Sequence, residues 1–460
     1  MNALVSKLSA LVSPEQISTA PAYLEELSWD ALSESRIHPL HRPERAAPIC
    51  VVMPMTTEEV RQIVLLANGE RIAIVPYGGG SGLMGGALCV RPSIVLDLRR
   101  MNKIIEIDGE ARSARVQAGI VLEALDQRLN EVGFILGHDP WTVPVATVGG
   151  AIATNSVGYR AGIYGSMGEQ VLGLQAVLPN GEILHTRGVQ KSSAGIDLKA
   201  LLIGGEGCFG VITEATIRIF PAPEARCLIG LKFDSFEGGY AAIQRIFNQR
   251  LAPAVLDFGD DVERLEGGAV LYLGFEGSRV SVDVDAKRAL EICERHGARR
   301  LADREAEIFW RDRHVIARRF AQNRRERRER GKDGSYRDWI HVALPASKVL
   351  QFRRDAAMLI EKHGVRLLES GLWVQPELFS MRLGAEDAGS LNGQLSLQQA
   401  IEELLGLAQK MGGSMEYTHG VGVKLAALMG AEHGYGLDIM RQLKKTLDPN
   451  NILNPGKMAL

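Results

Sequence analysis

The sequence has few cysteines and no long apolar run. Its five cysteines are scattered over 460 residues and include no C-x-x-C pair. This spacing disfavours a thiolate metal cluster and indicates reduced thiols in a reducing compartment. No run of roughly 18 apolar residues predicts a membrane-spanning helix, and the first residues lack the apolar core of a secretory signal peptide. We therefore expect a cytoplasmic protein.

Positively and negatively charged residues are also nearly equal in number. The chain carries 53 Lys and Arg against 55 Asp and Glu, for a formal net charge of −2. This balance gives no general signature of nucleic-acid binding, and no nucleic-acid partner is expected. Hydrophobic residues make up 46% of the chain, which is ordinary for a globular protein. The length predicts two or three domains with a large core.

Glycine is instead concentrated in particular stretches, beginning with VPYGGGSGLMGG at residues 75–86. A β-α-β pattern precedes it: a strand within 48–54, a helix capped by Thr56 or Thr57 and ended by Gly69, and a strand over 72–75. Backbone N–H groups of such a loop can form an anion-binding nest, since glycine lets phosphate oxygens approach closely. A purely structural turn is the alternative.

The loop also matches the dinucleotide fingerprint G-x-G-x-x-G at Gly80, Gly82 and Gly85. A Rossmann crossover needs a dozen or more residues, usually as a helix that opens at the last glycines. Only seven residues, one of them Pro92, separate Gly85 from the next predicted strand at 93–98. The loop should therefore lead directly into another strand, and the fold should not be a Rossmann fold.

A second glycine-rich block covers residues 137–184 and begins GHDPWTVPVATVGG. So many small residues indicate backbone packed closely against a flat ligand. The block ends in an alternating strand, 171–178, and a Pro-Asn-Gly turn that predicts a hairpin. From 228 to 345, strand-like and helical stretches alternate in a way typical of an α+β domain with an antiparallel sheet.

Five motifs occur in order: P-x-G-G-G-S-G, A-T-V-G-G-x-I-A-T-N, G-G-E-G-x-F-G-V-I-T, H-G-V-G at 419–422 and L-D-P-N-N-I-L-N-P-G-K at 447–457. They resemble the vanillyl-alcohol oxidase / p-cresol methylhydroxylase superfamily of flavoproteins. Within it, the chain resembles the branch of D-lactate and glycolate dehydrogenases and alkylglycerone-phosphate synthase. The resemblance runs from about residue 45 to the C-terminus.

The resemblance implies an α+β fold in which a two-subdomain FAD-binding domain, not of Rossmann type, carries an α+β cap domain with an antiparallel sheet. We expect an N-terminal helical segment at 1–44, the FAD-binding domain at 45–223, the cap at 224–408 and a C-terminal segment, 409–460, that returns to the flavin.

The resemblance also implies a set of FAD-binding residues. The glycine loop would wrap the pyrophosphate, the second block would line the isoalloxazine and ribityl region, and Val211 with Ile212 would hold the adenine side. Ser81 stands where some relatives carry a flavin-linking histidine, so we expect non-covalent FAD. The predicted set is Pro76, Gly78, Gly79, Gly80, Ser81, Gly82, His138, Pro140, Thr147, Val148, Gly149, Gly150, Thr154, Asn155, Gly158, Tyr164, Glu206, Gly210, Val211, Ile212, Asn454 and Lys457.

The family pattern is broken at the metal site. Relatives that oxidise D-2-hydroxy acids bind a divalent metal through two cap histidines and a glutamate just before H-G. Here the corresponding segment 368–383 contains no histidine, and Thr418 occupies the glutamate position. One imidazole and one hydroxyl do not hold a metal ion, so none is expected.

The candidate catalytic residues are His419, Tyr417, Arg313 and Arg382. His419 is the expected base, since removing hydride from an alcohol leaves a proton that imidazole can accept near neutral pH. Tyr417 would donate a hydrogen bond to the substrate. Arg313 matches the family arginine, although its usual Thr and Lys companions are replaced by Ala317 and Trp339. Arg382, on an alternating strand, is a candidate for binding a carboxylate or phosphate.

These features predict an FAD-dependent oxidoreductase that dehydrogenates a small alcohol, a D-2-hydroxy acid or an aromatic alcohol, by hydride transfer to flavin N5. Two alternatives stay open: a flavoenzyme like alkylglycerone-phosphate synthase, working through a flavin–substrate adduct, and a flavin-binding subunit of a larger redox complex. The substrate is expected to be anionic or aromatic, and an electron acceptor of undetermined kind must complete the cycle.

The arginine-rich segment 318–332 carries eight positive residues against two glutamates. A solvated loop, a gate for an anionic substrate and a surface that docks on an acidic membrane or a redox partner are all open interpretations. A second copy of the chain is the remaining partner considered, as a homodimer.

Overall fold

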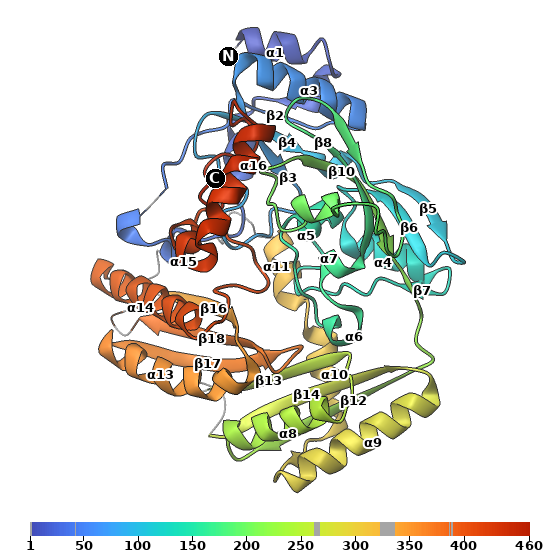
Figure 1. Ribbon diagram of the computed structural model, residues 1–460, viewed down its shortest axis with the longest axis vertical. Helices are drawn as coiled ribbons and strands as arrows, with labels where there is room; N and C mark the ends of the chain where they lie inside the picture. Colours follow the sequence, from blue (N-terminus) through green and yellow to red (C-terminus); the bar gives the residue numbers. More distant parts are fainter. Residues whose placement is uncertain (1, 42, 262–266, 323–335, 386, 388–389) are drawn as a thin grey trace.

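The computed structural model describes residues 2–41, 43–261, 267–322, 336–385, 387 and 390–460. Figure 1 shows an upper and a lower region, with α10 (Asp303–Asp312) and α11 (Val315–Gln322) between them. The upper region contains two larger sheets and the two-stranded pair of β7 (Phe134–Ile135) and β11 (Phe220–Pro221), and the lower region contains a single large sheet covered by helices. The expected α+β fold is confirmed.

The first sheet has the strand order β1-β2-β4-β3, and its last three strands are parallel. The strands are β1 (Ile17–Ser18), β2 (Cys50–Val52), β3 (Ala73–Tyr77) and β4 (Ser93–Asp97), and α3 (Thr57–Glu70) connects β2 to β3. Thr56 caps α3, as predicted, by accepting a hydrogen bond from the backbone N–H of Glu59. The helix does not end at Gly69: it continues to Glu70, and Arg71 adopts the left-handed conformation that terminates it, at φ 54°.

The glycine loop joins β3 directly to its parallel neighbour β4 with no helix between them, as the seven-residue spacing predicts. The second sheet is antiparallel, with the order β5-β6-β10-β8-β9. Its strands are β5 (Ile104–Asp108), β6 (Ser113–Gln117), β8 (Val171–Val177), β9 (Ile183–His185) and β10 (Val211–Arg218), with β7 (Phe134–Ile135) and β11 (Phe220–Pro221) paired nearby. The β8–β9 pair is the predicted hairpin.

Short helices of the upper region surround the second sheet (Figure 1). They are α4 (Leu122–Asn130), α5 (Val148–Ala153), α6 (Ala161–Tyr164) and α7 (Met167–Gln170). Buried aliphatic side chains of α4, α5 and β10 share one core. This core fixes the start of α5, and therefore the second glycine-rich block, against the sheet.

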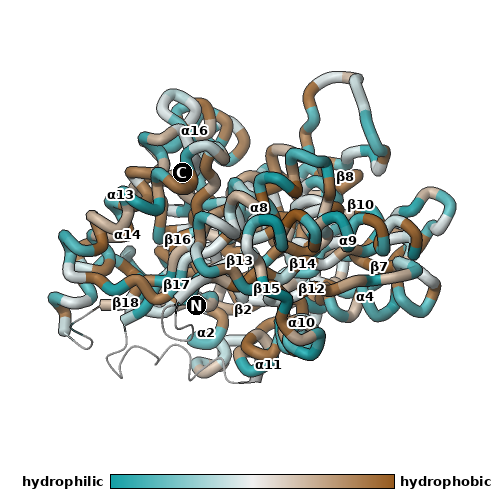
Figure 2. Tube along the Cα trace, turned by 90° about the horizontal axis from the view of Figure 1, so that it is seen from below, coloured by the Kyte–Doolittle hydropathy of each residue, from teal (hydrophilic) through white to brown (hydrophobic). Residues whose placement is uncertain are grey.

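The lower region is a seven-stranded antiparallel sheet with the order β15-β12-β14-β13-β17-β18-β16. Its strands are β12 (Ala225–Phe233), β13 (Val255–Asp261), β14 (Ala269–Gly277), β15 (Arg299–Arg300), β16 (Arg337–Ala343), β17 (Val365–Trp373) and β18 (Leu378–Ala385). Seen from below in Figure 2, α8 (Phe236–Asn248), α9 (Arg279–Arg295), α13 (Val349–Lys362) and α14 (Leu391–Lys410) lie over this sheet. An antiparallel cap sheet was expected, and this sheet matches it.

Both the N-terminal and the C-terminal segments lie in the upper region (Figure 1). The N-terminal segment forms α1 (Asn2–Leu8) and α2 (Pro21–Leu27), and the C-terminal segment forms α15 (Met429–His433) and α16 (Tyr435–Leu447). After α16 the chain runs beside β3, where Leu453 pairs with Ile74. The division at residues 44, 223 and 408 stays a prediction.

No helix among the described residues is long and apolar enough to cross a bilayer. Within the arginine-rich segment, Arg318 pairs with Glu123 of α4. Residues 323–332 lie outside the described residues, so the gate and docking interpretations stay predictions.

One fully buried carboxylate, Asp338 of β16, connects four separate segments of the chain. Its Oδ1 accepts a hydrogen bond from Nε of Arg36 at 2.5 Å, and its Oδ2 accepts from Nζ of Lys424 at 2.7 Å and from Gln398 of α14 at 3.1 Å. Burial raises the pKa of Asp338, but Arg36 and Lys424 outweigh burial and lower it to about 2. The carboxylate is therefore ionised throughout the physiological range.

We expect Asp338→Asn to lower the free energy of unfolding by about 3–5 kcal/mol, because it leaves two buried positive charges without their counterion. Urea unfolding of the purified protein measures this. Since the folded pKa is depressed, the stabilisation is present above the unfolded value of about 4 and is lost as pH falls toward 2. Asp312→Asn, at the exposed end of α10, is the control and should change the midpoint little. Equal midpoints for the two variants would contradict this role.

Candidate active site

A cleft with a volume of about 1010 Å³ lies between the upper and lower regions. Its walls come from the glycine loop, the start of α5, helices α10 and α11, strands β13, β16, β17 and β18, and residues 417–419. Pockets for drug-sized ligands are usually about 300–1000 Å³. The cleft is at the large end of this range, and we call the part of it lined by the lower sheet and residues 417–419 the lower compartment.

The upper wall is made of backbone that admits no side chain. A Cβ on Gly79 would lie 2.1 Å from the carbonyl oxygen of Val145. Gly80 has φ +61°, and a Cβ there would lie 2.0 Å from the hydroxyl of Tyr77. These contacts explain why glycine is required at both positions, and they leave bare backbone facing the cleft.

Glu206 holds the C-terminal H-G-V-G segment against this wall. Its carboxylate accepts hydrogen bonds from the backbone N–H groups of Val421 at 2.5 Å and Gly422 at 2.8 Å. Burial raises the pKa of Glu206 to about 7, although both N–H donors lower it. Asn454 adds a second link, because its side-chain amide donates to the carbonyl oxygens of Gly86 and Glu206.

His341 of β16 and His419 line the lower compartment, and Glu416 lies beside His419. The two imidazole rings meet edge to face with centroids 4.5 Å apart, and Nδ1 of His419 lies 3.5 Å from Oε1 of Glu416. Burial and the neighbouring His419 lower the pKa of His341 to about 3, with Arg36 and Lys424 acting in the same direction. His341 is therefore neutral at physiological pH. The nitrogen and carboxylate atoms of the three residues lie within 4.8 Å of one another, so the group could hold a metal ion.

Tyr417 and two tryptophans complete this compartment. Tyr417 is partly buried, its ring lies 5.7 Å from that of His341, and desolvation raises its pKa well above the usual value. The phenol therefore stays protonated and can donate a hydrogen bond. Trp339 and Trp373 line the cleft, and the Trp310 ring stacks on the guanidinium of Arg313, 3.6 Å from its ring centre.

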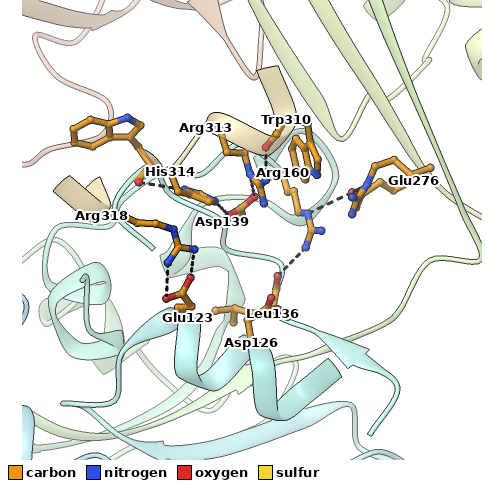
Figure 3. A network of polar contacts seen from close by, with 12 residues as sticks. Glu123, Asp126, Leu136, Asp139, Arg160, Glu276, Trp310, Arg313, His314 and Arg318 are labelled. Atoms are coloured by element: carbon orange, nitrogen blue, oxygen red, sulfur yellow. Dashed lines mark hydrogen bonds and ion pairs between the residues drawn. The ribbon is translucent and has the colours of Figure 1, made fainter. Parts of the chain in front are cut away.

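Arg313 lines the cleft but is already bound. Its Nε donates to Asp139 at 3.0 Å and its Nη1 to the carbonyl oxygen of Trp310 at 2.6 Å. Figure 3 shows that Asp139 also meets His314, whose Nε2 is 2.9 Å away. Burial raises the pKa of Asp139, but His314 and Arg313 lower it to about 2. This network attaches α10 and α11 to the upper region.

Arg382 of β18 also lines the cleft, in acidic surroundings. It lies 3.5 Å from Glu369 and 3.8 Å from Asp261. Asp257 lines the same region, and burial, with the charge of Glu369 added, raises its pKa to about 7. The region around Arg382 therefore disfavours a substrate anion.

Most of the predicted residues do come together in the cleft. All four predicted catalytic residues line it. The predicted cofactor residues that line it are Pro76, Gly78, Gly79, Gly80, Ser81, Gly82, Pro140, Thr147, Gly149, Gly150, Thr154, Glu206, Gly210, Ile212 and Asn454.

Seven predicted cofactor residues do not belong to its lining: His138, Val148, Asn155, Gly158, Tyr164, Val211 and Lys457. Val148 and Val211 are fully buried in hydrophobic cores, and Gly158 packs against the backbone of Asp139. The structure gives these three residues packing roles rather than direct cleft contacts.

The other four have partners in the protein itself. His138 bonds Ser156, and Asn155 accepts from the N–H of Gly168. Tyr164 packs on Phe220, with ring centroids 4.5 Å apart. Lys457 is fully buried and donates to the carbonyl oxygens of Leu88 and Pro455. Each of these side chains supports a wall rather than facing the cleft.

Several residues of the cleft were not predicted from the sequence: Asp30, Arg36, Asp257 and His341 line it, and Glu416 contacts His419. The alternation in β16 was the signal for His341, since Arg337, Trp339 and His341 share one face of that strand. No comparable signal marked Asp30 or Arg36, because the N-terminal segment has no motif.

Comparison with known proteins agrees with this geometry. Residues 48–187 match the model of an FAD binding domain, and residues 222–458 match the C-terminal domain of FAD linked oxidases. The chain is 32% identical to a D-lactate dehydrogenase of Archaeoglobus fulgidus over 449 residues, covering 94% of this chain and 96% of the relative. It is 29% identical to the glycolate oxidase subunit GlcD of Bacillus subtilis over 430 residues, covering 90% and 89%.

The fold also matches a solved alkyldihydroxyacetonephosphate synthase, with a TM-score of 0.81, 22% identity and coverage of 99% of this chain and 86% of the synthase chain. The chain belongs to the FAD-linked oxidase family. The resemblance seen in the sequence is confirmed, and FAD is the cofactor of this oxidoreductase.

The walls of this FAD-linked oxidase fit the cofactor. The glycine loop and the start of α5 present bare backbone to the cleft, because a Cβ on Gly79 or Gly149 would clash with protein atoms packed against them. The lining of the cleft extends from this backbone, which we call the cofactor cradle, to His419. The bare backbone at Gly78–Gly82 suits a pyrophosphate. Ser81 is no candidate for a covalent flavin link, so non-covalent attachment stays the prediction.

We expect Gly79→Ala to lose most of its FAD, because the new Cβ would meet the backbone of Val145 and displace the loop. The ratio of flavin to protein absorbance after purification measures this, and denaturation should release all flavin from the wild type. Gly69→Ala in α3 is the control, since a Cβ there meets nothing within 4 Å. Full flavin content in Gly79→Ala would contradict the cradle, and flavin that stays on the denatured chain would contradict non-covalent attachment.

Proposed function

We propose that this FAD-linked oxidase dehydrogenates a small 2-hydroxy acid of the lactate or glycolate type, with an aromatic alcohol as the other substrate considered. The observation that carries the proposal is the position of His419. It stands where the cofactor cradle opens into a compartment lined by Tyr417, His341 and Trp339. Such a compartment suits a small polar substrate held beside an aromatic wall.

FAD, when bound, supplies the acceptor for the hydride of the substrate carbon. The chain supplies the proton acceptor and the orientation. Glu416 lies 3.5 Å from Nδ1 of His419, which favours the tautomer with the hydrogen on Nδ1 and leaves the lone pair on Nε2. Nε2 would take the hydroxyl proton as the C–H bond breaks, so that the alcohol becomes a ketone or aldehyde.

Neighbouring groups keep this base in place. Oε1 of Glu416 accepts hydrogen bonds from the backbone N–H groups of Thr418 and His419, which fixes the carboxylate on one side of the ring. His341 packs on the ring and stays neutral, so it does not repel the imidazolium that forms. Tyr417 would donate to the substrate oxygen.

We further propose that the group of His341, Glu416 and His419 handles protons and holds no metal ion. Two observations support this. Oε1 of Glu416 already accepts hydrogen bonds from the backbone N–H groups of Thr418 and His419. Arg36 and Lys424, whose charges help to keep His341 neutral, would also raise the cost of placing a divalent cation beside it.

Elemental analysis of protein purified without chelator tests this, and we expect far less than one transition-metal ion per chain. Flavin reduction by substrate should be unaffected by prior treatment with EDTA. Stoichiometric zinc or manganese, together with slower reduction after its removal, would show a metal centre instead.

His419→Gln should slow anaerobic flavin reduction by D-lactate by about 10²-fold or more, because the proton acceptor is lost. The flavin spectrum and content should stay unchanged. His433→Gln, at the exposed end of α15, is the matched control and should reduce at the wild-type rate. Reduction of the His419→Gln flavin at the wild-type rate would remove His419 from the reaction.

A synthase-like reaction on an acylated phosphate is the second candidate. The apolar side chains of Ile308 and Ile316, on α10 and α11, line the cleft and are partly exposed, so an alkyl or acyl chain could lie along them. One feature argues against this reaction. Alkylglycerone-phosphate synthases carry a run of histidines before H-G, whereas this chain has Glu416, Tyr417 and Thr418 there. The dehydrogenase remains the proposal that the site supports better.

A further inference from the structure

We propose that Arg36, from the N-terminal segment, binds the negatively charged group of the substrate, in place of Arg313 and Arg382. The identification of that substrate as a 2-hydroxy acid rests on the proposed function; the anion site itself rests on the geometry below.

Arg36 is held rigidly at the cleft. It ends a short 3₁₀ helix, Glu34–Arg36, and its side chain is only 6% exposed. Gln394 of α14 donates to the carbonyl oxygens of Glu34 and Ile37, on both sides of the arginine. The guanidinium lies 5.4 Å from the ring centre of Trp339, and both residues line the cleft. The side chain of Arg36 is thus already ordered before a ligand binds, so binding would cost little additional side-chain entropy.

Two carboxylates balance the charges of Arg36 and Lys424. Arg36 and Lys424 share one carboxylate, that of Asp338. Both oxygens of Asp338 are fully used, since Oδ1 also accepts from the N–H of Trp339 and Oδ2 from Gln398. Glu416 is the next carboxylate, and it is engaged by backbone N–H groups and His419. Neither carboxylate accepts a hydrogen bond from Nη2 of Arg36.

Arg36 also has unused hydrogen-bonding capacity. Its guanidinium bonds Asp338 through Nε, while Nη2 is buried and has no hydrogen-bond acceptor among the described residues. A buried donor without a partner is destabilising. A carboxylate or phosphate oxygen arriving in the cleft would supply that acceptor, and the planar guanidinium suits both groups.

The other two cleft arginines already have acidic neighbours. Arg313 donates to Asp139, and Arg382 lies between Glu369 and Asp261. Trp339 and His341 share one face of β16, so an anion on Arg36 would lie at the same end of the compartment as His341 and His419. The end that holds the base is thus also the end at which a guanidinium donor has no acceptor among the described residues.

The test titrates the FAD-loaded protein with oxalate, an unreactive dicarboxylate, and follows the change in flavin absorbance and in melting temperature. Oxamide, its neutral amide, is the paired probe. In Arg36→Lys and Arg36→Met, we expect oxalate to bind about ten- to a hundred-fold more weakly and its thermal shift to shrink, with the oxamide response unchanged. Arg36→Lys keeps the charge beside Asp338, so it remains informative if Arg36→Met does not fold.

Arg45→Lys is the matched control: Arg45 is in the same segment, lies 4.4 Å from the ring centre of Trp29 and does not belong to the cleft lining. It should bind oxalate like the wild type. Equal oxalate affinity in the wild type and Arg36→Lys, or no oxalate binding by the wild type, would overturn the proposal. The two proposals fail separately: Arg36-dependent oxalate binding without flavin reduction by any 2-hydroxy acid would contradict only the proposed reaction.

Discussion

The cleft depends on the buried contact between Asp338 and its two cations. Arg36 lies 302 residues from Asp338 along the chain and Lys424 lies 86 residues from it, yet all three are almost completely buried together. Removing ions from water is costly, so the chain gains from this arrangement only if every partner is present. The requirement brings the N-terminal segment, the cap sheet and the C-terminal segment to one end of the cleft. Burial and the neighbouring His419 lower the pKa of His341, and Arg36 and Lys424 act in the same direction.

A second carboxylate, Glu206, sets the distance between the cofactor cradle and the reacting residues. It follows the glycines of the G-G-E-G motif and receives two backbone N–H groups just after His419. The base therefore stands next to the cofactor wall, although more than two hundred residues separate the two segments. Glu206 thus binds backbone N–H groups at one end of the cleft, and Asp338 binds the cations Arg36 and Lys424 at the other. The glycine loop supplies the surface for the cofactor.

Features of this site that depend on a short stretch of sequence, such as loop length and glycine motifs, could be predicted from the sequence. Seven residues between Gly85 and β4 excluded the Rossmann crossover, and the glycine loop lines the cleft as expected. Motif residues with packing roles could not be told from contacts: Lys457 and Val211 belong to matching motifs but are buried away from the cleft. His341 and Arg36 were missed because their roles arise only when β16 and the N-terminal segment meet. Arg313 and Arg382 were predicted correctly as cleft residues, but their acidic neighbours come from distant segments.

Removal of a hydride from the hydroxyl-bearing carbon of a small acid is tested most directly by anaerobic flavin bleaching. D-lactate and D-lactate deuterated at C2 would be mixed in parallel with the FAD-loaded protein, with an acylated dihydroxyacetone phosphate in a third reaction. We predict full bleaching by D-lactate or a related 2-hydroxy acid, severalfold slower for the deuterated compound, because the C–H bond breaks in that step. No bleaching by any 2-hydroxy acid, with fatty acid released from the acylated phosphate, would contradict this reaction and establish the synthase reaction.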